Sequence, residues 1–243
     1  MEELNTLSWV LLGLGALVVG LSKTALPGAG TLAVVLFATA LPARESTAGL
    51  LVLLIVGDLF AVWMYRHTVD WAILRRLIWP VLVGVAVGSV FLGLASDGVV
   101  RRVIGGILLA LLAFTLWRRQ RGSTVQPGRV AGYGFGWLGG FTTMVANAGG
   151  PVMSLYLLGM RLDVKTFLGT AAYFFFAINL FKVPFQIGLG LLDLRMLSIV
   201  AVLVPLVVMA AFAGRWLASR ISQRVFDTLV LVLTAVGALN LLI

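Results

Sequence analysis

Residues 46 to 65 read STAGLLVLLIVGDLFAVWMY, twenty residues in which Asp58 is the only formally charged side chain. The hydrocarbon core of a bilayer is about 30 Å thick, and a helix needs roughly 20 apolar residues to cross it. This stretch therefore predicts a transmembrane helix.

The rest of the 243-residue chain is equally apolar, with 61% hydrophobic residues, 11% charged residues and a mean hydropathy of +1.09. Soluble domains carry about 25% charged residues, so this chain has too little polar surface to face water on all sides. Further runs that are long enough to span lie at 77 to 95, 166 to 187, 196 to 214 and 225 to 243, with a shorter one at 103 to 117. The sequence predicts an all-α integral membrane protein.

Two apolar regions are interrupted by Gly, Pro, Asn or Lys: 7 to 22 with 30 to 41, and 130 to 142 with 150 to 160. Their second arms, of 12 and 11 residues, are too short to cross a bilayer comfortably. Irregular backbone at membrane depth is tolerated only where it is buried in protein or lines a cavity. We expect both regions to form broken or re-entrant helical hairpins.

The same order of elements occurs twice, since each hairpin is followed by three spans. An odd number of crossings reverses the second half, which predicts two inverted repeats. An offset of 120 residues lays GLSKTALPGAG (20 to 30) over GFTTMVANAGG (140 to 150), with glycines coinciding at both ends. Pro80 and Pro205 also recur in corresponding later helices. A duplicated architecture follows from both observations.

The loops indicate orientation and domain boundaries. We assign a first membrane repeat to 1 to 117, a basic cytoplasmic linker to 118 to 129, and a second repeat to 130 to 243. Cytoplasmic loops are enriched in Lys and Arg, which places both termini outside, because the inner loops then hold 12 of the 18 basic residues. These are Arg66, Arg75, Arg76, Arg118, Arg119, Arg121, Arg129, Arg161, Lys165, Arg215, Arg220 and Arg224. The net charge of +9 is thus explained by orientation and not by nucleic acid, for which no recognition motif is present.

The hairpin tips are the candidate binding site, because broken helices at matching places in two inverted halves offer free backbone N–H groups to a substrate. Neither tip has an acidic residue, and Lys23 is the only charge, so the expected ligand is a small anion. The candidate ligands from the two tips are Lys23, Thr24, Gly28, Gly30, Thr143, Asn147, Gly150 and Pro151.

Polar side chains inside the spans extend this site. FAINLFKVPF (176 to 185) places Asn179 and Lys182 on one helical face. Asp58 corresponds to Asn179 at an offset of 121 and is the only carboxylate well inside a span. It is either half of a fixed ion pair with Lys23 or Lys182, or a protonatable coupling group; we favour the pair, with Lys182 as partner.

Simpler roles exist for the same side chains. Lys23 and Lys182 could extend to the lipid headgroups, and Asn147 could form a hydrogen bond between helices. The sequence offers no enzyme chemistry, since it has no cysteine, a single histidine (His67) in a predicted loop, and no nucleotide motif or paired acid and base. We therefore predict no catalytic residue, no metal site and no cofactor.

Three segments carry a family resemblance: GLSKTALPGAGTLAV, VANAGGPVMSLYLLGMRL and INLFKVPF. In this order they resemble the sulfite exporter TauE/SafE family of membrane permeases, over essentially the whole chain. The resemblance implies transport of sulfur-containing anions, such as sulfite and organosulfonates, across the bacterial inner membrane. By position it marks Lys23, Gly28, Gly30, Asn147, Gly150, Pro151, Asn179 and Lys182. The lysine of SKTALPGAG departs from the more usual glycine-rich, lysine-free tip and adds a positive charge.

The resulting hypothesis is a secondary transporter that moves a small anion, a sulfur oxyanion or organosulfonate, across the inner membrane by alternating access. Its partners are that anion, the lipid bilayer and a coupling proton or other ion. A proton-coupled carboxylate transporter is the alternative within transport. An integral membrane enzyme or assembly factor is the alternative from another class.

Overall fold

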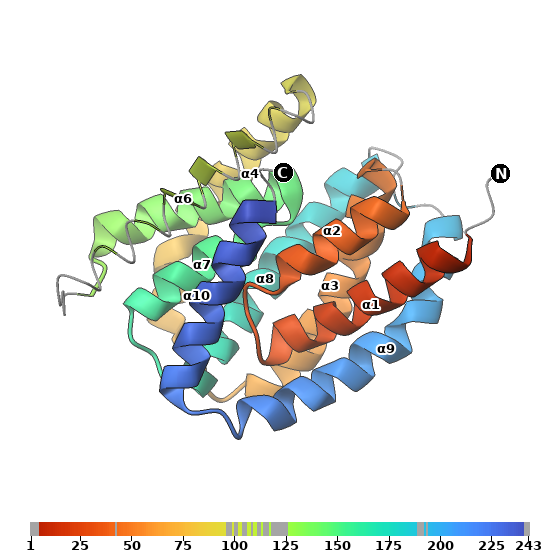
Figure 1. The fold of residues 1–243 in the computed structure, drawn as a ribbon. Helices are drawn as coiled ribbons and strands as arrows, with labels where there is room; N and C mark the ends of the chain where they lie inside the picture. The colour runs from red at the N-terminus through yellow and green to blue at the C-terminus, as the bar shows by residue number, and fades with distance from the viewer. Residues whose placement is uncertain are drawn as a thin grey trace.

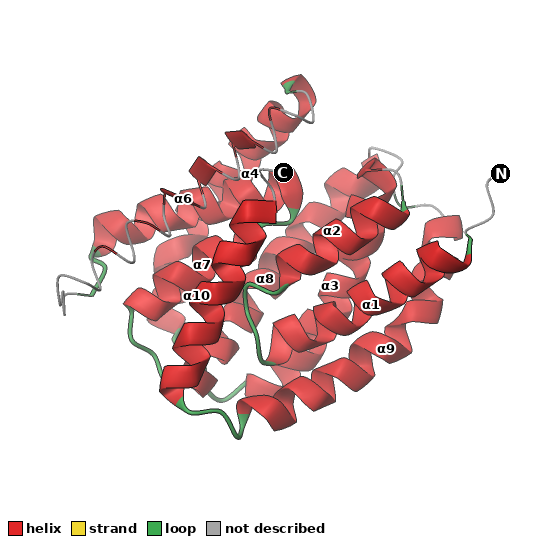
Figure 2. Ribbon diagram, viewed as in Figure 1, coloured by secondary structure: helices red, strands yellow, loops and turns green. Residues whose placement is uncertain are grey.

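The computed structural model describes residues 5–41, 43–95, 126–188 and 194–240, with Leu192 and isolated residues between 99 and 117. All regular structure in these residues is helical (Figure 2). The helices are α1 (Thr6–Thr24), α2 (Gly30–Ala40), α3 (Ala43–Tyr65), α4 (Trp71–Leu94), α6 (Arg129–Ala146), α7 (Gly149–Gly159), α8 (Val164–Gly188), α9 (Leu194–Ala218) and α10 (Gln223–Asn240). The short span predicted at 103 to 117 and the linker at 118 to 129 fall for the most part outside the described residues.

Five of the described helices, α1, α3, α4, α8 and α9, are long and apolar enough to cross a membrane. This confirms the predicted all-α membrane protein. The two short arms are also present, because α2 and α7 have only 11 residues each. One detail differs: α1 runs unbroken through Ser22 and Lys23 to Thr24, so the first arm of that hairpin is itself long enough to span.

The hairpins pack across the molecule and not only within their own half. α1 lies along α9, α6 lies along α4, and α3 contacts α8 between them (Figure 1). Glycines make the first two contacts close: a Cβ added to Gly20 would lie 2.3 Å from the Val207 carbonyl oxygen, and one added to Gly140 would lie 2.2 Å from that of Val81. Gly20 and Gly140 are an aligned pair of the predicted duplication. The inverted relation of the two halves remains a prediction.

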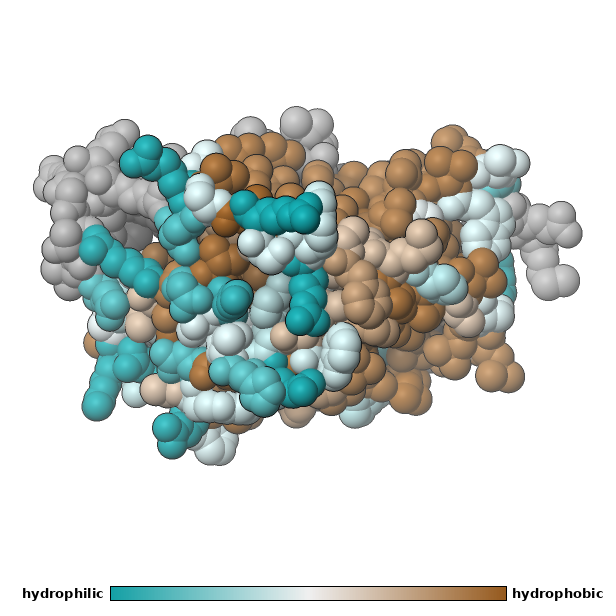
Figure 3. Space-filling model, turned by 90° about the horizontal axis from the view of Figure 1, so that it is seen from below, coloured by the Kyte–Doolittle hydropathy of each residue, from teal (hydrophilic) through white to brown (hydrophobic). Residues whose placement is uncertain are grey.

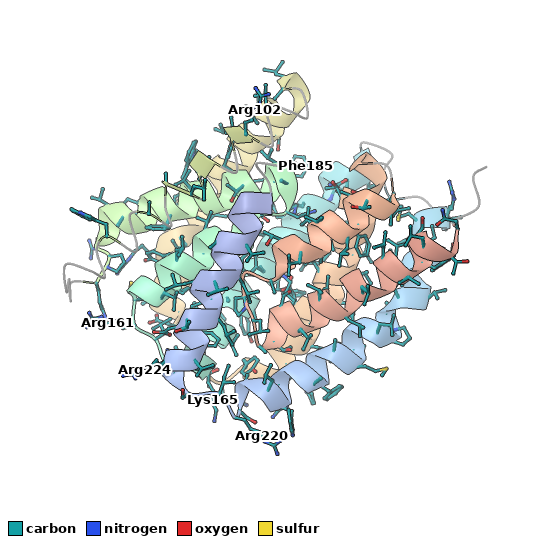
Figure 4. The ribbon with its side chains drawn as sticks, viewed as in Figure 1. Arg102, Arg161, Lys165, Phe185, Arg220 and Arg224 are labelled. Carbon is teal, nitrogen blue, oxygen red and sulfur yellow. The ribbon has the colours of Figure 1, made fainter. Side chains whose placement is uncertain are left out.

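Basic side chains gather at one end of the bundle. Arg161 and Lys165 flank the turn between α7 and α8, while Arg220 and Arg224 flank the turn between α9 and α10 (Figure 4). Seen from this end, hydrophilic residues gather on one side of the surface and hydrophobic residues on the other (Figure 3). Such a polar end with apolar flanks suits a protein that crosses a bilayer, and this is the end that the loop charges predict to face the cytoplasm.

Candidate anion site

A cavity of about 50 Å³ lies where both hairpin tips meet α3 and α8. By this measure one water needs roughly 10–15 Å³, so the space suits a few waters or a compact anion. The lining residues are Ser22, Lys23, Pro27, Gly28, Gly30, Thr31, Leu54, Asp58, Thr143, Asn147, Gly150, Pro151, Ala171, Ala172, Phe175 and Asn179.

Two helices begin at this cavity. The residues before α2 and α7 are Ala29 and Ala148, and neither has a side chain that caps the first turn. The N-terminal N–H groups of both helices therefore have no capping side chain, and each helix dipole places partial positive charge there. The tips are close: a Cβ added to Gly150 would lie 3.8 Å from the Gly28 nitrogen. Gly28 has φ 103°, which favours glycine.

Lys23, near the end of α1, forms an ion pair with Asp58 of α3. Its Nζ lies 2.7 Å from Asp58 Oδ1 and 4.7 Å from the ring centre of Phe175. Gly57 makes room for the lysine stem, because a Cβ there would approach Lys23 Cγ to 2.9 Å. The Asp58 side chain is fully buried and that of Lys23 is 10% exposed. Lys23 thus extends into the cavity and not to the lipid headgroups.

Asn179 of α8 holds the other carboxylate oxygen. Its Nδ2 donates to Asp58 Oδ2 at 2.7 Å. The two residues that correspond at an offset of 121 therefore contact each other where α3 meets α8. Asn179 Oδ1 is buried and has no hydrogen-bond partner. An unpartnered buried amide oxygen beside a cavity is costly unless water or a ligand group satisfies it.

Lys182 binds the second tip. Its Nζ donates to the Thr143 carbonyl at 2.9 Å and to Asn147 Oδ1. Asn147 ends α6 in the left-handed conformation, φ 51°, where its side chain can turn toward α8. Asn147 Nδ2 also reaches the Thr47 carbonyl at 3.5 Å. The expected hydrogen bond of Asn147 to another helix is therefore present. The alternative that Lys182 extends to the lipid headgroups is wrong, because its side chain is fully buried.

The structure brings together most of the candidates and corrects two assignments. Asp58 pairs with Lys23, whereas we favoured Lys182 as its partner. Thr24 does not line the cavity, because its hydroxyl bonds the Gly20 carbonyl and its side chain packs against Gly214 of α9. The other predicted tip residues line the cavity, and Lys182 lies behind Asn147 and Thr143.

The charge of the site has a different origin from the one expected. The sequence predicts that Lys23 is the only source of positive charge in the site, but in the structure the carboxylate of Asp58 neutralises the charge of Lys23. The positive charge of the group Lys23, Asp58 and Lys182 comes from its second lysine, and the formal sum is one positive charge. Together with two uncapped helix N-termini, this favours an anion.

Sequence reasoning missed the apolar half of the lining, including Phe175, Leu54 and Ala171. These residues sit in apolar spans where nothing distinguishes them from neighbours that face lipid. Among the described residues no group of three or more His, Cys, Asp or Glu could hold a metal.

The fold and this cavity define a multi-pass membrane protein with a buried polar site suited to a small anion. The family model described as Sulfite exporter TauE/SafE matches residues 12–241, and the chain belongs to that family. Members of this family are transporters and not enzymes, and the name of the family denotes sulfite export. Comparison with curated proteins and with solved structures found no match.

Proposed function

We propose that this protein is a secondary transporter that carries a small sulfur oxyanion or organosulfonate across the cell inner membrane, by alternating access around the cavity between the tips. The main support is that two helix N-termini without a capping side chain and the ammonium of Lys23 border the same cavity. Backbone N–H groups and an ammonium are the donors that oxyanions bind in proteins. The basic end of the bundle and the predicted inverted repeats support an orientation with both termini outside.

The size of the cavity favours compact substrates. Sulfite has four heavy atoms and methanesulfonate five, and both present several oxygens to converging donors. We expect larger sulfonates to require a wider state of the site. A carboxylate such as lactate presents its charge on two oxygens only, which matches two helix ends and a lysine less well.

Uptake by purified protein in liposomes tests this function, with labelled sulfite and methanesulfonate as substrates and lactate for comparison. Lys23→Ala should lower substrate affinity about ten- to a hundredfold, because a hydrogen bond to a charged group contributes about 1.5–3 kcal/mol and Asp58 is left unpaired beside the anion. Lys165→Ala removes an exposed lysine from the basic end and serves as the control. Uptake of lactate in preference to both sulfur anions would refute the proposed substrate class, and equal uptake by wild type and Lys23→Ala would refute the role of Lys23.

A further inference from the structure

Asp58 occupies the donors that an anion would need. One carboxylate oxygen holds the Lys23 ammonium and the other holds the Asn179 amide N–H, each at 2.7 Å. All three residues line the cavity. In this arrangement the only ammonium that lines the cavity among the described residues is engaged by a carboxylate of the protein itself.

The orientation of the Asn179 amide depends on the charge of Asp58. An ionised carboxylate only accepts hydrogen bonds, so it must face the NH₂ group of the amide. The amide oxygen is then left over, and Oδ1 of Asn179 is in fact buried without a partner. A protonated carboxyl group has one O–H to donate, and the unpartnered oxygen of the Asn179 amide can accept this hydrogen bond.

Building on the transport function proposed above, we propose that Asp58 is a proton-binding site whose protonation releases Lys23 and turns over the Asn179 amide, so that proton and anion are carried together. The proton adds to Oδ2 of Asp58, and the new O–H donates to Asn179 Oδ1. Asn179 Nδ2 and the Lys23 ammonium are then free to donate to the anion. On the opposite side the anion leaves, the proton leaves, and the ion pair forms again.

The surroundings of Asp58 leave few other groups to carry this exchange. The charged residues that face it are Lys23 from α1 and Lys182 from α8, and Lys182 is held by Asn147 and Thr143. α2 has no titratable residue, and those of α9 are Arg195 and Arg215, near its two ends. The ionised carboxylate of Asp58 and the anion therefore compete for the same donors, and a proton on Asp58 leaves these donors to the anion.

Linkage makes the proposal quantitative. If a proton on Asp58 raises the affinity for the anion, the anion raises the affinity for the proton by the same factor. Anion affinity should then rise as pH falls, by up to about tenfold per pH unit for a single linked proton. Methanesulfonate is the suitable probe because its own charge is constant across the neutral range. Binding is measured by the ligand-induced rise in Tm between pH 5.5 and 8.5.

Three variants separate the parts of this exchange. Asp58→Asn imitates the protonated carboxyl group, so it should bind methanesulfonate at pH 8 as wild type does at low pH, retain anion exchange, and lose accumulation driven by a pH gradient. Asn179→Leu removes one of the two donors, so the affinity for methanesulfonate should fall about tenfold. The affinity should still depend on pH, because protonation of Asp58 still releases Lys23. Gln186→Leu is the control, since it removes a buried amide two turns further along α8, away from the lining residues, and should change neither quantity.

Wild-type protein provides a second test that does not depend on the variants folding. Liposomes that enclose a pH-sensitive dye should acidify inside when methanesulfonate enters down its gradient, with one proton for each anion. Binding that is independent of pH, or anion entry with no change of internal pH, would overturn the proton site while leaving the proposed transport function intact. No binding and no uptake of any sulfur anion would overturn the transport function itself, and the proton site with it.

Discussion

Replacing Gly140 by alanine should push two helix backbones apart. The added Cβ would lie 2.2 Å from the carbonyl oxygen of Val81 and 2.9 Å from its carbonyl carbon. An ordinary contact begins near 3.4 Å, so α6 must move away from α4 by about 1 Å, which costs dispersion contacts along the interface. Backbone atoms cannot escape by a change of rotamer. We therefore expect the upper end of the overpacking range, about 3 kcal/mol of unfolding free energy.

The matched control lies on the same helix. Gly134→Ala meets nothing within 4 Å, and an interior helical Gly→Ala change stabilises by up to about 1 kcal/mol. This gain applies to both positions of α6, so the two variants should differ by the overpacking cost of about 3 kcal/mol in detergent-based unfolding, with Gly134→Ala at or above wild type. Gly20→Ala should behave like Gly140→Ala, because its Cβ would lie 2.3 Å from the Val207 oxygen. Equal stability of the Gly140 and Gly134 variants would refute the close approach of α4 and α6.

Three further predictions concern single groups. Lys182→Met should weaken anion binding at least tenfold, because it removes the uncompensated positive charge next to the cavity; unchanged affinity in the binding assay would argue that Lys182 only closes the end of α6. Asp163 accepts hydrogen bonds from the Thr166 hydroxyl and from the backbone at the start of α8, which lowers its pKa. Asp163→Ala should therefore lower the free energy of unfolding by about 1 kcal/mol at pH 7. This difference from wild type should disappear as the pH falls through the pKa of Asp163, because the carboxylate is then protonated in both the folded and the unfolded chain. A difference that stays constant down to about pH 3 would contradict this. A cysteine at Ser123 should react with an impermeant reagent only from the cytoplasmic side, and labelling from outside would reverse the orientation.

Apolar length could be predicted from the sequence because it is a local property. The run at 46 to 65 is a candidate span in the structure, and the Gly and Pro residues of the tips mark where helices break. Comparing the two halves also gave the correspondence of Asp58 with Asn179, although their hydrogen bond is a finding of the structure. Each of these depends on spacing along the chain alone.

Rotation of each helix about its axis could not be predicted in this way. Successive residues of a helix point about 100° apart, so Lys23 faces the cavity while Thr24, next to it in α1, faces Gly214 of α9. The choice of partner for Asp58 has the same cause. Lys23 reaches Asp58 because α1 continues to Thr24, two residues beyond the predicted arm of 7 to 22, and because Gly57 leaves space for the lysine stem.

The packing of α1 on α9 has a consequence for biogenesis. α1 is made well before α9, so the glycine face around Gly20 stays without its partner until α9 has left the ribosome. α4 must likewise wait for α6. Neither half can complete its packing by itself inside the translocon. Two half-length chains made separately would have to find each other in the bilayer before either reached its final fold.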